Sequence, residues 1–237
     1  MKKFIAMLLV LTMALALAAC GAQTDIHTKG EGVMTYEQYA AAELDTEVVI
    51  EAFVQAHQAW WFDSNVGHGK ITVYAQDKDG AYFLYEMVCS EEDAAKLVPG
   101  TKIKVTGYKS EWAGEVEIMD ATFEILEGTW IAEAVDATAW LGTDELIKHQ
   151  NQLAVFKGMT VEAVEYKNGE PGDDIYVTVS KDGANYSFCV EVYLTGPDTD
   201  VYKAGGELAV GDVIDVTGFV YWYEGINTHI TAVSKAA

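Results

Sequence analysis

Aromatic side chains gather beside charged residues at four places in this sequence. Trp60-Trp61-Phe62 forms the first group and Glu111-Trp112 the second. Tyr166-Lys167 and Tyr221-Trp222-Tyr223 form the third and fourth. Aromatic faces beside acids suit sugar rings and peptide segments, because apolar stacking adds to hydrogen bonding. The candidate ligand-binding residues are Trp60, Trp61, Glu111, Trp112, Tyr221, Trp222 and Tyr223.

The same rings have a second interpretation, because Trp and Tyr side chains are mostly buried in folded proteins. They would then pack over the end of a domain or join two domains, without touching a ligand. A variant with both Trp61 and Trp112 changed to Ala separates the two interpretations, since it unfolds if these rings belong to the core.

Motifs of the common catalytic sites do not occur in the sequence. It contains no Gly-x-Ser-x-Gly, no His-Glu-x-x-His and no phosphate-binding glycine loop. We therefore expect no catalytic residue and no cofactor.

Two groups of residues have side chains that metal ions accept as ligands. His57 and His68 share one stretch with Asp63 and could hold a transition metal. Asp173-Asp174 and Asp198-Thr199-Asp200 carry oxygens that suit calcium. Neither acidic run has the spacing of a complete calcium loop, and histidines outside a motif are usually structural. We therefore expect no metal.

The composition is strongly acidic. Lys and Arg together number 15 against 37 Asp and Glu, which gives a formal net charge of −22, and none of the 15 is Arg. Arg supplies the planar fork that grips phosphate, and a nucleic-acid backbone would be repelled by the acids. The sequence therefore predicts no nucleic-acid partner, and the acidity is interpreted as an aid to solubility.

The N-terminus has the pattern of an export signal. Met1-Lys2-Lys3 precedes an apolar run over residues 4–19, which is shorter than the roughly 20 residues that cross a bilayer. Leu17-Ala18-Ala19-Cys20-Gly21 resembles the lipobox of bacterial lipoproteins. The resemblance implies that residues 1–19 are a cleaved signal peptide and that lipid on Cys20 anchors the exported chain to the outer face of the cell membrane. The alternative is an ordinary signal peptide with a chance cysteine.

An internal duplication divides the rest of the chain. Residues 97–108 match residues 208–219, and residues 50–52 match residues 161–163, in both cases 111 positions later. Two copies of one module are therefore expected. The expected segments are a flexible tether (20–33), a first OB-like domain (34–126) and a second OB-like domain (127–237).

Each copy contains five short runs of β-branched and aromatic residues with frequent period-2 alternation, which predict strands. Short helices are expected to begin at Thr35, Ser90 and Thr143, whose side chains can cap a first turn. The expected strands are 48–54, 71–75, 82–87, 102–108 and 116–118 in the first copy, and 159–164, 175–179, 186–192, 213–219 and 229–231 in the second.

Glycines mark the expected turns. Asp79-Gly80 and Asp182-Gly183 stand between the second and third runs of each copy and predict tight hairpins, because Asp-Gly accepts positive φ. These pairs are 103 positions apart, so the first copy has an eight-residue insertion before this point and the second has one after it. Gly100 and Gly211 predict chain reversals before the fourth strand.

Five short strands with a helix between the third and fourth is the plan of the OB-fold. The pattern Leu97-x-x-Gly100-x-x-Ile103-x-Val105-x-Gly107 and its copy resemble extracytoplasmic bacterial OB-fold modules. The resemblance implies a mainly β chain with two tandem five-stranded OB-like barrels, each with one or two short helices. OB barrels usually bind ligands near the loops joining strands one and two and strands four and five, which would bring the aromatic groups to one rim.

Cys89 and Cys189 lie in different copies and in no metal-binding pattern. Export permits a disulfide between them, but a core of this size does not need one. Two buried thiols are the expected state, with an interdomain disulfide as the alternative.

Together these features predict a membrane-anchored extracytoplasmic binding or scaffolding lipoprotein without enzymatic activity. Its expected partners are the membrane, through lipidated Cys20, and an envelope oligosaccharide or peptide on the aromatic rim. The alternative is an accessory hydrolase acting on envelope glycan. Such an enzyme would have a cleft with two carboxylates ~5–10 Å apart, at least one of them with a pKa raised by burial.

Overall fold

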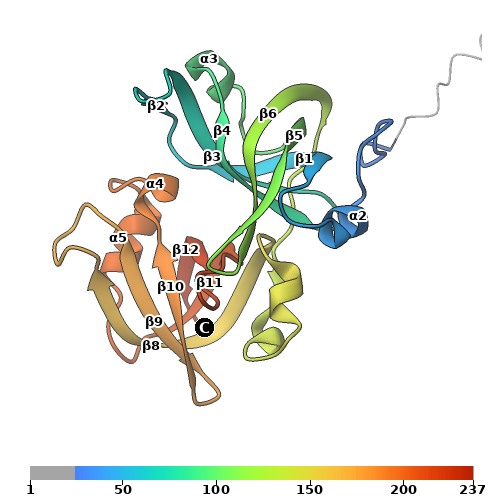
Figure 1. Cartoon of the computed structure of the whole chain (residues 1–237). Coiled ribbons are helices and arrows are strands. Elements are labelled where there is room, and N and C mark those ends of the chain that lie inside the picture. The colour runs from blue at the N-terminus through green and yellow to red at the C-terminus, as the bar shows by residue number, and fades with distance from the viewer. Residues whose placement is uncertain (1–24, 237) are drawn as a thin grey trace, which may run out of the picture.

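Two small β-barrels make up residues 25–236, the part of the chain that the computed structural model describes. The predicted signal peptide over residues 1–19 and the predicted lipidation site Cys20 lie outside the described residues. Each barrel is built from one six-stranded sheet, and the helices are few and short (Figure 1). The predicted class, mainly β with two OB-like folds, is confirmed.

The first sheet curls into a barrel. Its strands are β1 (Glu47–His57), β2 (Trp61–Asp63), β3 (His68–Gln76), β4 (Ala81–Val88), β5 (Thr101–Trp112) and β6 (Glu115–Thr129). The order is β1-β5-β6-β4-β3-β2, and β1 also pairs with β3. The joint between β4 and β6 is parallel and joins only two pairs, Phe83 with Glu117 and Leu84 with Ile118. The barrel is therefore not strictly closed.

The second sheet repeats this plan. Its strands are β7 (Val135–Asp136), β8 (Leu153–Tyr166), β9 (Ile175–Lys181), β10 (Ala184–Val190), β11 (Val213–Phe219) and β12 (His229–Lys235). The order is β11-β12-β10-β9-β8-β7, and β11 also pairs with β8. The parallel joint between β10 and β12 is a single pair, Cys189 with His229. The long strands of both sheets thus have equivalent neighbours, as expected for a duplicated module.

Short helices cover the ends of the barrels. The first barrel has α2 (Tyr36–Ala41) and α3 (Glu91–Ala94). A capping box of Thr35 and Gln38 begins α2, and Ser90 caps the start of α3. The helix expected after Thr143 is instead a 3-10 turn, η2 (Leu146–His149), which follows another, η1 (Thr138–Trp140). No helix within residues 25–236 combines the length and the apolar character needed to cross a bilayer.

The second barrel has two helices where the first has one. Both α4 (Val192–Thr195) and α5 (Asp200–Gly206) stand between β10 and β11. The equivalent connection of the first barrel holds only α3. This difference accounts for the insertion that the sequence places late in the second copy.

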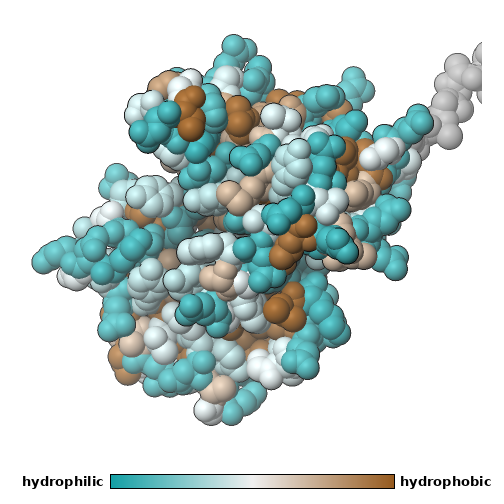
Figure 2. Space-filling view, in the orientation of Figure 1, coloured by the Kyte–Doolittle hydropathy of each residue, from teal (hydrophilic) through white to brown (hydrophobic). Residues whose placement is uncertain are grey.

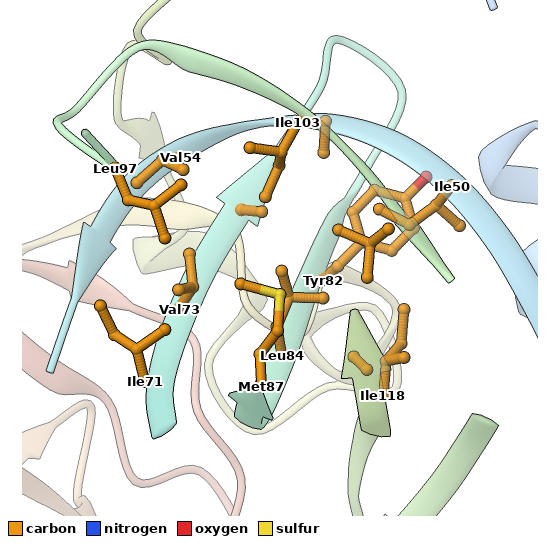
Figure 3. Packing of buried hydrophobic residues seen from close by; sticks show 14 of the residues in the cluster. Ile50, Val54, Ile71, Val73, Tyr82, Leu84, Met87, Leu97, Ile103 and Ile118 are labelled. Carbon is orange, nitrogen blue, oxygen red and sulfur yellow. The ribbon is translucent and has the colours of Figure 1, made fainter. Parts of the chain in front are cut away.

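Apolar side chains that alternate along the strands fill each barrel. In the first barrel they meet from opposite strands in one cluster (Figure 3), with Ile50, Ile71, Leu84, Met87 and Ile103 fully buried. A separate cluster of the same kind fills the second barrel. Alternation therefore leaves the other face of β3 and β4 free to meet a neighbour.

The two barrels are joined by a third apolar cluster. It contains Tyr74 and Phe83 from the first sheet and Phe219 from the second, all of them buried. The Tyr74 and Phe219 rings stack with centroids 4.2 Å apart and planes 7° apart. The Tyr74 hydroxyl also lies 2.7 Å from Nδ1 of His229. The apolar contact between the barrels therefore includes one buried hydrogen bond.

The segment before the first helix lies against the first barrel. The His27 ring contacts the rings of Phe53 and Trp130 edge-on, with centroids 5.3 and 5.1 Å apart. The Lys29 ammonium forms an ion pair with Asp77 and donates to the carbonyl oxygen of Glu51. The chain is thus held to the barrel from His27 onward.

The two Asp-Gly turns differ from each other. Asp182 and Gly183 have φ of 51° and 83°, as expected for a tight hairpin turn. Asp79 and Gly80 do not have positive φ; the Asp77 carboxylate accepts both of their backbone N–H groups, at 2.8 and 3.0 Å. Gly80 is needed there because the Tyr36 ring occupies the place where a Cβ would stand.

Candidate functional site

A cleft of about 940 Å³ lies between the two barrels. Both barrels line it, and nine of its nineteen lining residues are Trp, Tyr or Phe. Figure 1 shows β2 of the first barrel and α4 of the second on the same side of the molecule, and both contribute to the lining. Both barrels are therefore needed to form the cleft.

Equivalent loops of the two barrels face this cleft. The first barrel contributes the loop that follows β1 and the turn between β5 and β6, with Trp60 and Trp112 respectively. The second contributes Lys167 from the β8–β9 loop and Tyr221 from the β11–β12 loop. These are the loops beside which OB barrels usually hold ligands. The loops that are candidate binding faces in each barrel therefore line the same cleft.

The turns after β5 and β11 hold each other through residues that the duplication makes equivalent. Trp112 and Tyr223, 111 positions apart, have ring centroids 5.1 Å apart. The Glu224 N–H donates to the carbonyl oxygen of Ala113 at 2.7 Å, and these residues have φ of 54° and 53°. Gly114 follows with φ of 90°, close to the Trp222 ring. This contact fixes one edge of the cleft.

The structure places the seven sequence-predicted ligand residues in two groups. Glu111 lies exposed on β5 and does not line the cleft. Trp222 packs against the second core, and its backbone N–H donates to Glu115 at 2.8 Å. The residues that line the cleft are Trp60, Trp61, Trp112, Tyr221 and Tyr223.

The lining rings differ in how much solvent they see. Trp61, Trp112, Tyr193 and Tyr223 are 42%, 57%, 65% and 45% exposed. Trp60 is half-buried, and its Nε1 donates to the Cys89 carbonyl oxygen at 2.9 Å. Packing therefore accounts for Trp60, whereas the side chains of Trp61, Trp112, Tyr193 and Tyr223 are exposed to solvent.

Acids outnumber bases along the lining. Glu86, Asp174 and Glu191 face one base, Lys167. Lys167 is itself paired with Asp174, with Nζ 2.9 Å from the carboxylate. The Glu86 carboxylate lies 2.8 Å from Nζ of Lys70. Glu191 is therefore the lining acid that has no Lys partner within residues 25–236.

Glu191 also has a structural role. Its carboxylate accepts the backbone N–H groups of Tyr193 and Leu194 at 3.1 and 2.8 Å, which caps α4. It accepts a third hydrogen bond from Gln58 of the first barrel at 3.1 Å. Burial raises the pKa of Glu191 to about 7, against the lowering effect of these donors. The residue thus ties α4 to the opposite wall.

Two further carboxyls with raised pKa lie at the joint but outside the lining. Burial raises the pKa of Glu115 to about 8 and that of Glu117 to about 7. Glu115 accepts from Nδ2 of Asn151 at 2.6 Å and from the Trp222 backbone. These contacts commit Glu115 to joining the barrels, so its raised pKa does not mark a hydrolytic pair in the cleft.

An unpaired acceptor lies in the cleft wall. The Asn227 side-chain oxygen is buried and has no hydrogen-bond partner within residues 25–236. Its neighbour on the wall, His229, stays neutral because burial lowers its pKa to about 3. A ligand that donates a hydrogen bond would satisfy the Asn227 oxygen.

The residues considered as metal ligands have other partners. His57 and His68 each place Nδ1 against the carbonyl oxygen of the next residue, at 2.8 and 3.3 Å. Asp63 pairs with Lys70 at 2.9 Å. Among residues 25–236 no group of three or more His, Cys, Asp or Glu side chains could hold an ion. Cys89 and Cys189 are both buried and unpaired.

Sequence reasoning missed several lining residues. Tyr85 and Glu86 lie on β4. The sequence alone does not tell which residues of this strand face the other barrel. Tyr193 lies in α4, which belongs to the insertion of the second copy and has no equivalent in the first. Asn227 carries no motif. Their common signal is geometric, because each faces the other barrel.

Comparisons with known proteins give structural likeness only. No protein-family model matches the chain, and no curated protein matches it. A murine DNA-binding protein bound with double-stranded DNA is 12% identical, with 80% of this chain and 96% of that chain covered and a TM-score of 0.36. p202 HIN1 in complex with 12-mer dsDNA is 11% identical, with coverages of 82% and 95% and a TM-score of 0.37. A replication protein A heterotrimer bound to ssDNA is 12% identical, with coverages of 86% and 52% and a TM-score of 0.35.

Two sequence-based predictions are wrong against this comparison. Net charge and missing Arg predict no nucleic-acid partner, yet the three similar structures just named are described as bound to double-stranded or single-stranded DNA. The same finding overturns the assignment to extracytoplasmic binding or scaffolding of envelope glycan or peptide. The physical reason is that a charge summed over the whole chain does not fix the chemistry of one face. At TM-scores below 0.5 the likeness identifies no ligand of this chain, so the ligand has to be argued from the cleft.

Proposed function

We propose that this chain is a non-catalytic binding protein that takes a small organic ligand into the cleft between its barrels. The main support for this proposal is a cleft of about 940 Å³ in which nine of the nineteen lining residues are aromatic. Sites for small molecules are usually concave, of roughly 300–1,000 Å³, and lined by apolar and aromatic groups with a few polar ones. The cleft fits that description.

Preorganisation of the walls supports the proposal. The stacked Tyr74 and Phe219 rings and the hydrogen bonds of Glu115 hold the two barrels together behind the cleft. The N–H of Ala59 donates to the carbonyl oxygen of Tyr193 at 2.9 Å across the mouth. Walls that are already fixed lose little conformational entropy when a ligand binds. Exposed rings on such walls are suited to stacking.

A binding screen with the full chain tests the proposal. The panel contains small aromatic amines, neutral aromatic compounds and aromatic acids, together with single-stranded and duplex oligonucleotides, and binding is read by tryptophan fluorescence and calorimetry. We expect small compounds to bind, and the Trp112→Ala variant to weaken their binding by about five- to thirtyfold, since one lost stacking contact contributes about 1–2 kcal/mol.

Phe62→Ala is the matched control. Phe62 is 57% exposed beside Trp61 but does not line the cleft, so its removal should leave binding unchanged. The proposal fails if no small compound binds, if only the oligonucleotides bind, or if Trp112→Ala binds as tightly as the unchanged chain.

We also propose that the chain is exported and held to the outer face of the cell membrane by lipid on Cys20. The support is the Leu17-Ala18-Ala19-Cys20-Gly21 motif after a charged start and an apolar run. Two or more acyl chains on one residue anchor stably, whereas one chain binds marginally. Metabolic labelling with an alkyne fatty acid should mark the unchanged chain and not Cys20→Ser. Equal labelling of both would overturn this proposal.

A further inference from the structure

We infer that the ligand of the cleft is an organic cation that carries at least one N–H donor, such as an aromatic or alkyl amine. This inference rests on the proposed binding function and adds the chemical class of the ligand. Three independent features of the cleft carry it: the sign of the lining charges, the open aromatic faces and the unpaired acceptor of Asn227.

The lining charges favour a cation. Glu86, Asp174 and Glu191 line the cleft against Lys167 alone, whose ammonium is already held by Asp173 and Asp174 at 3.7 and 2.9 Å. Lys167 is the one lysine among the lining residues of the described chain; Lys70 lies behind the lining, paired with Asp63 and Glu86. The face seen in Figure 2 is mostly hydrophilic, with apolar residues scattered over it.

The open rings favour a cation as well. The negative face of an indole or phenol attracts an ammonium that lies within about 6 Å of the ring centroid. Trp112 and Tyr223 form a pair at the edge of the cleft, and Tyr193 stands exposed on α4. An internal example already exists on this rim, because Nζ of Lys70 lies 5.3 Å from the centroid of Trp61. The cleft thus combines several ring faces with acids, as sites for organic ammonium ions do.

The Asn227 oxygen determines the kind of cation. It is a buried acceptor without a partner among the described residues, and Asn227 is one of the residues that line the cleft. A buried polar group without a hydrogen bond is costly, so a ligand N–H placed there gains the contact and removes the cost. A quaternary ammonium has no N–H and would leave the oxygen unpaired. A primary or secondary amine is therefore favoured over a quaternary one.

Four matched probes test the inference by calorimetry on the full chain. They are phenethylamine, its N,N,N-trimethyl derivative, neutral 2-phenylethanol and anionic 3-phenylpropionate. We expect phenethylamine to bind at least about tenfold more tightly than 2-phenylethanol and more tightly than the trimethyl derivative, with the anion weakest. Added salt should weaken the amine and leave the alcohol unchanged.

Variants connect each expectation to a residue. Asn227→Leu should remove the preference for phenethylamine over its trimethyl derivative, because the acceptor is gone. Trp112→Ala should weaken both cations, whereas Phe62→Ala should change neither. Thermal unfolding of each variant is measured in parallel, so that only folded variants are compared.

The outcomes separate the inference from the proposed function. If 2-phenylethanol binds as tightly as phenethylamine, or if the anion binds best, the inferred positive charge of the ligand is wrong, but the proposal that the cleft binds a ligand stands. If the trimethyl derivative binds as tightly as the amine, the N–H donor is wrong. If none of the four probes binds, the inference fails, and the wider screen then decides whether the cleft binds any small compound.

Discussion

Burial changes the chemistry of single carboxyl groups around the joint between the barrels. It raises the pKa of Glu115 to about 8 and those of Glu117 and Glu191 to about 7, because an apolar setting disfavours the charged form. Glu115 and Glu191 offset part of this cost through backbone N–H donors. Glu117 has the charge of Glu86 nearby, which raises its pKa further.

The raised pKa of Glu117 predicts a pH dependence of stability. The folded chain holds this proton more tightly than the unfolded chain does, so its stabilising contribution is complete below the ordinary Glu pKa and is lost as the pH rises through about 7. Glu117→Gln mimics the protonated form. Its Tm should equal that of the unchanged chain near about pH 4 and exceed it by roughly 2–8 °C near about pH 8.5, if about 1–2 kcal/mol is regained.

Glu124→Gln is the control for this prediction. Glu124 is an exposed acid on the same strand, so its neutral variant should follow the unchanged chain at both pH values. A Glu117→Gln gain that is as large under acid conditions as under alkaline ones would contradict the role of proton binding.

The exposed indoles should be dispensable for folding. Trp61 and Trp112 are 42% and 57% exposed, so the Trp61→Ala, Trp112→Ala double variant loses little buried area. We expect its unfolding free energy in urea to change by less than about 1 kcal/mol, while ligand binding is lost. If the double variant unfolds, or is as unstable as a variant with a truncated core residue, both rings belong to the core.

At the scale of elements, the duplication was visible in the sequence because strand alternation and turn glycines leave a local pattern. Each of the ten long strands overlaps a predicted run, and Gly100 and Gly211 have φ of 93° and 91°. Two bounds differ: β6 extends far beyond the predicted 116–118, and Val192, predicted as strand, begins α4. The short strands β2 and β7 were not predicted, since three and two residues are too few to alternate. The cleft residues Tyr193 and Asn227 were missed because their role depends on the other barrel.

The paired turns after β5 and β11 give an element-scale prediction. Gly114 has φ of 90°, and a Cβ there would stand 2.8 Å from Cδ1 of Trp222. Gly114→Ala therefore suffers both backbone strain and a clash, which together should cost about 2–4 kcal/mol of unfolding free energy. The measurement is urea denaturation.

Gly169→Ala separates strain from clash. Gly169 has φ of 78° in the β8–β9 loop of the second barrel but open space around the Cβ position. It should cost only the strain, about 1 kcal/mol. If both variants lose the same stability, the contact between the turns does not fix the cleft edge.

At the scale of the whole molecule, the cleft exists because the barrels share a buried joint. Tyr74, Phe83 and Phe219 bury aromatic area between them, and Glu115 of the first barrel bonds to Asn151 and Trp222 of the second. Domains that share only a small polar interface move freely, whereas an apolar joint of this kind couples them. Coupled barrels should unfold together.

Phe219 is where that coupling can be broken. It is 2% exposed and stacks on Tyr74, so Phe219→Ala should cost about 3–5 kcal/mol, most of it from the joint. We expect one calorimetric transition for the unchanged chain and two for Phe219→Ala, together with weaker ligand binding. Phe156→Ala, inside the second core, is the matched control and should lower the Tm with one transition retained. Two transitions in the unchanged chain would mean that the barrels fold independently and that the cleft walls are not fixed by this joint.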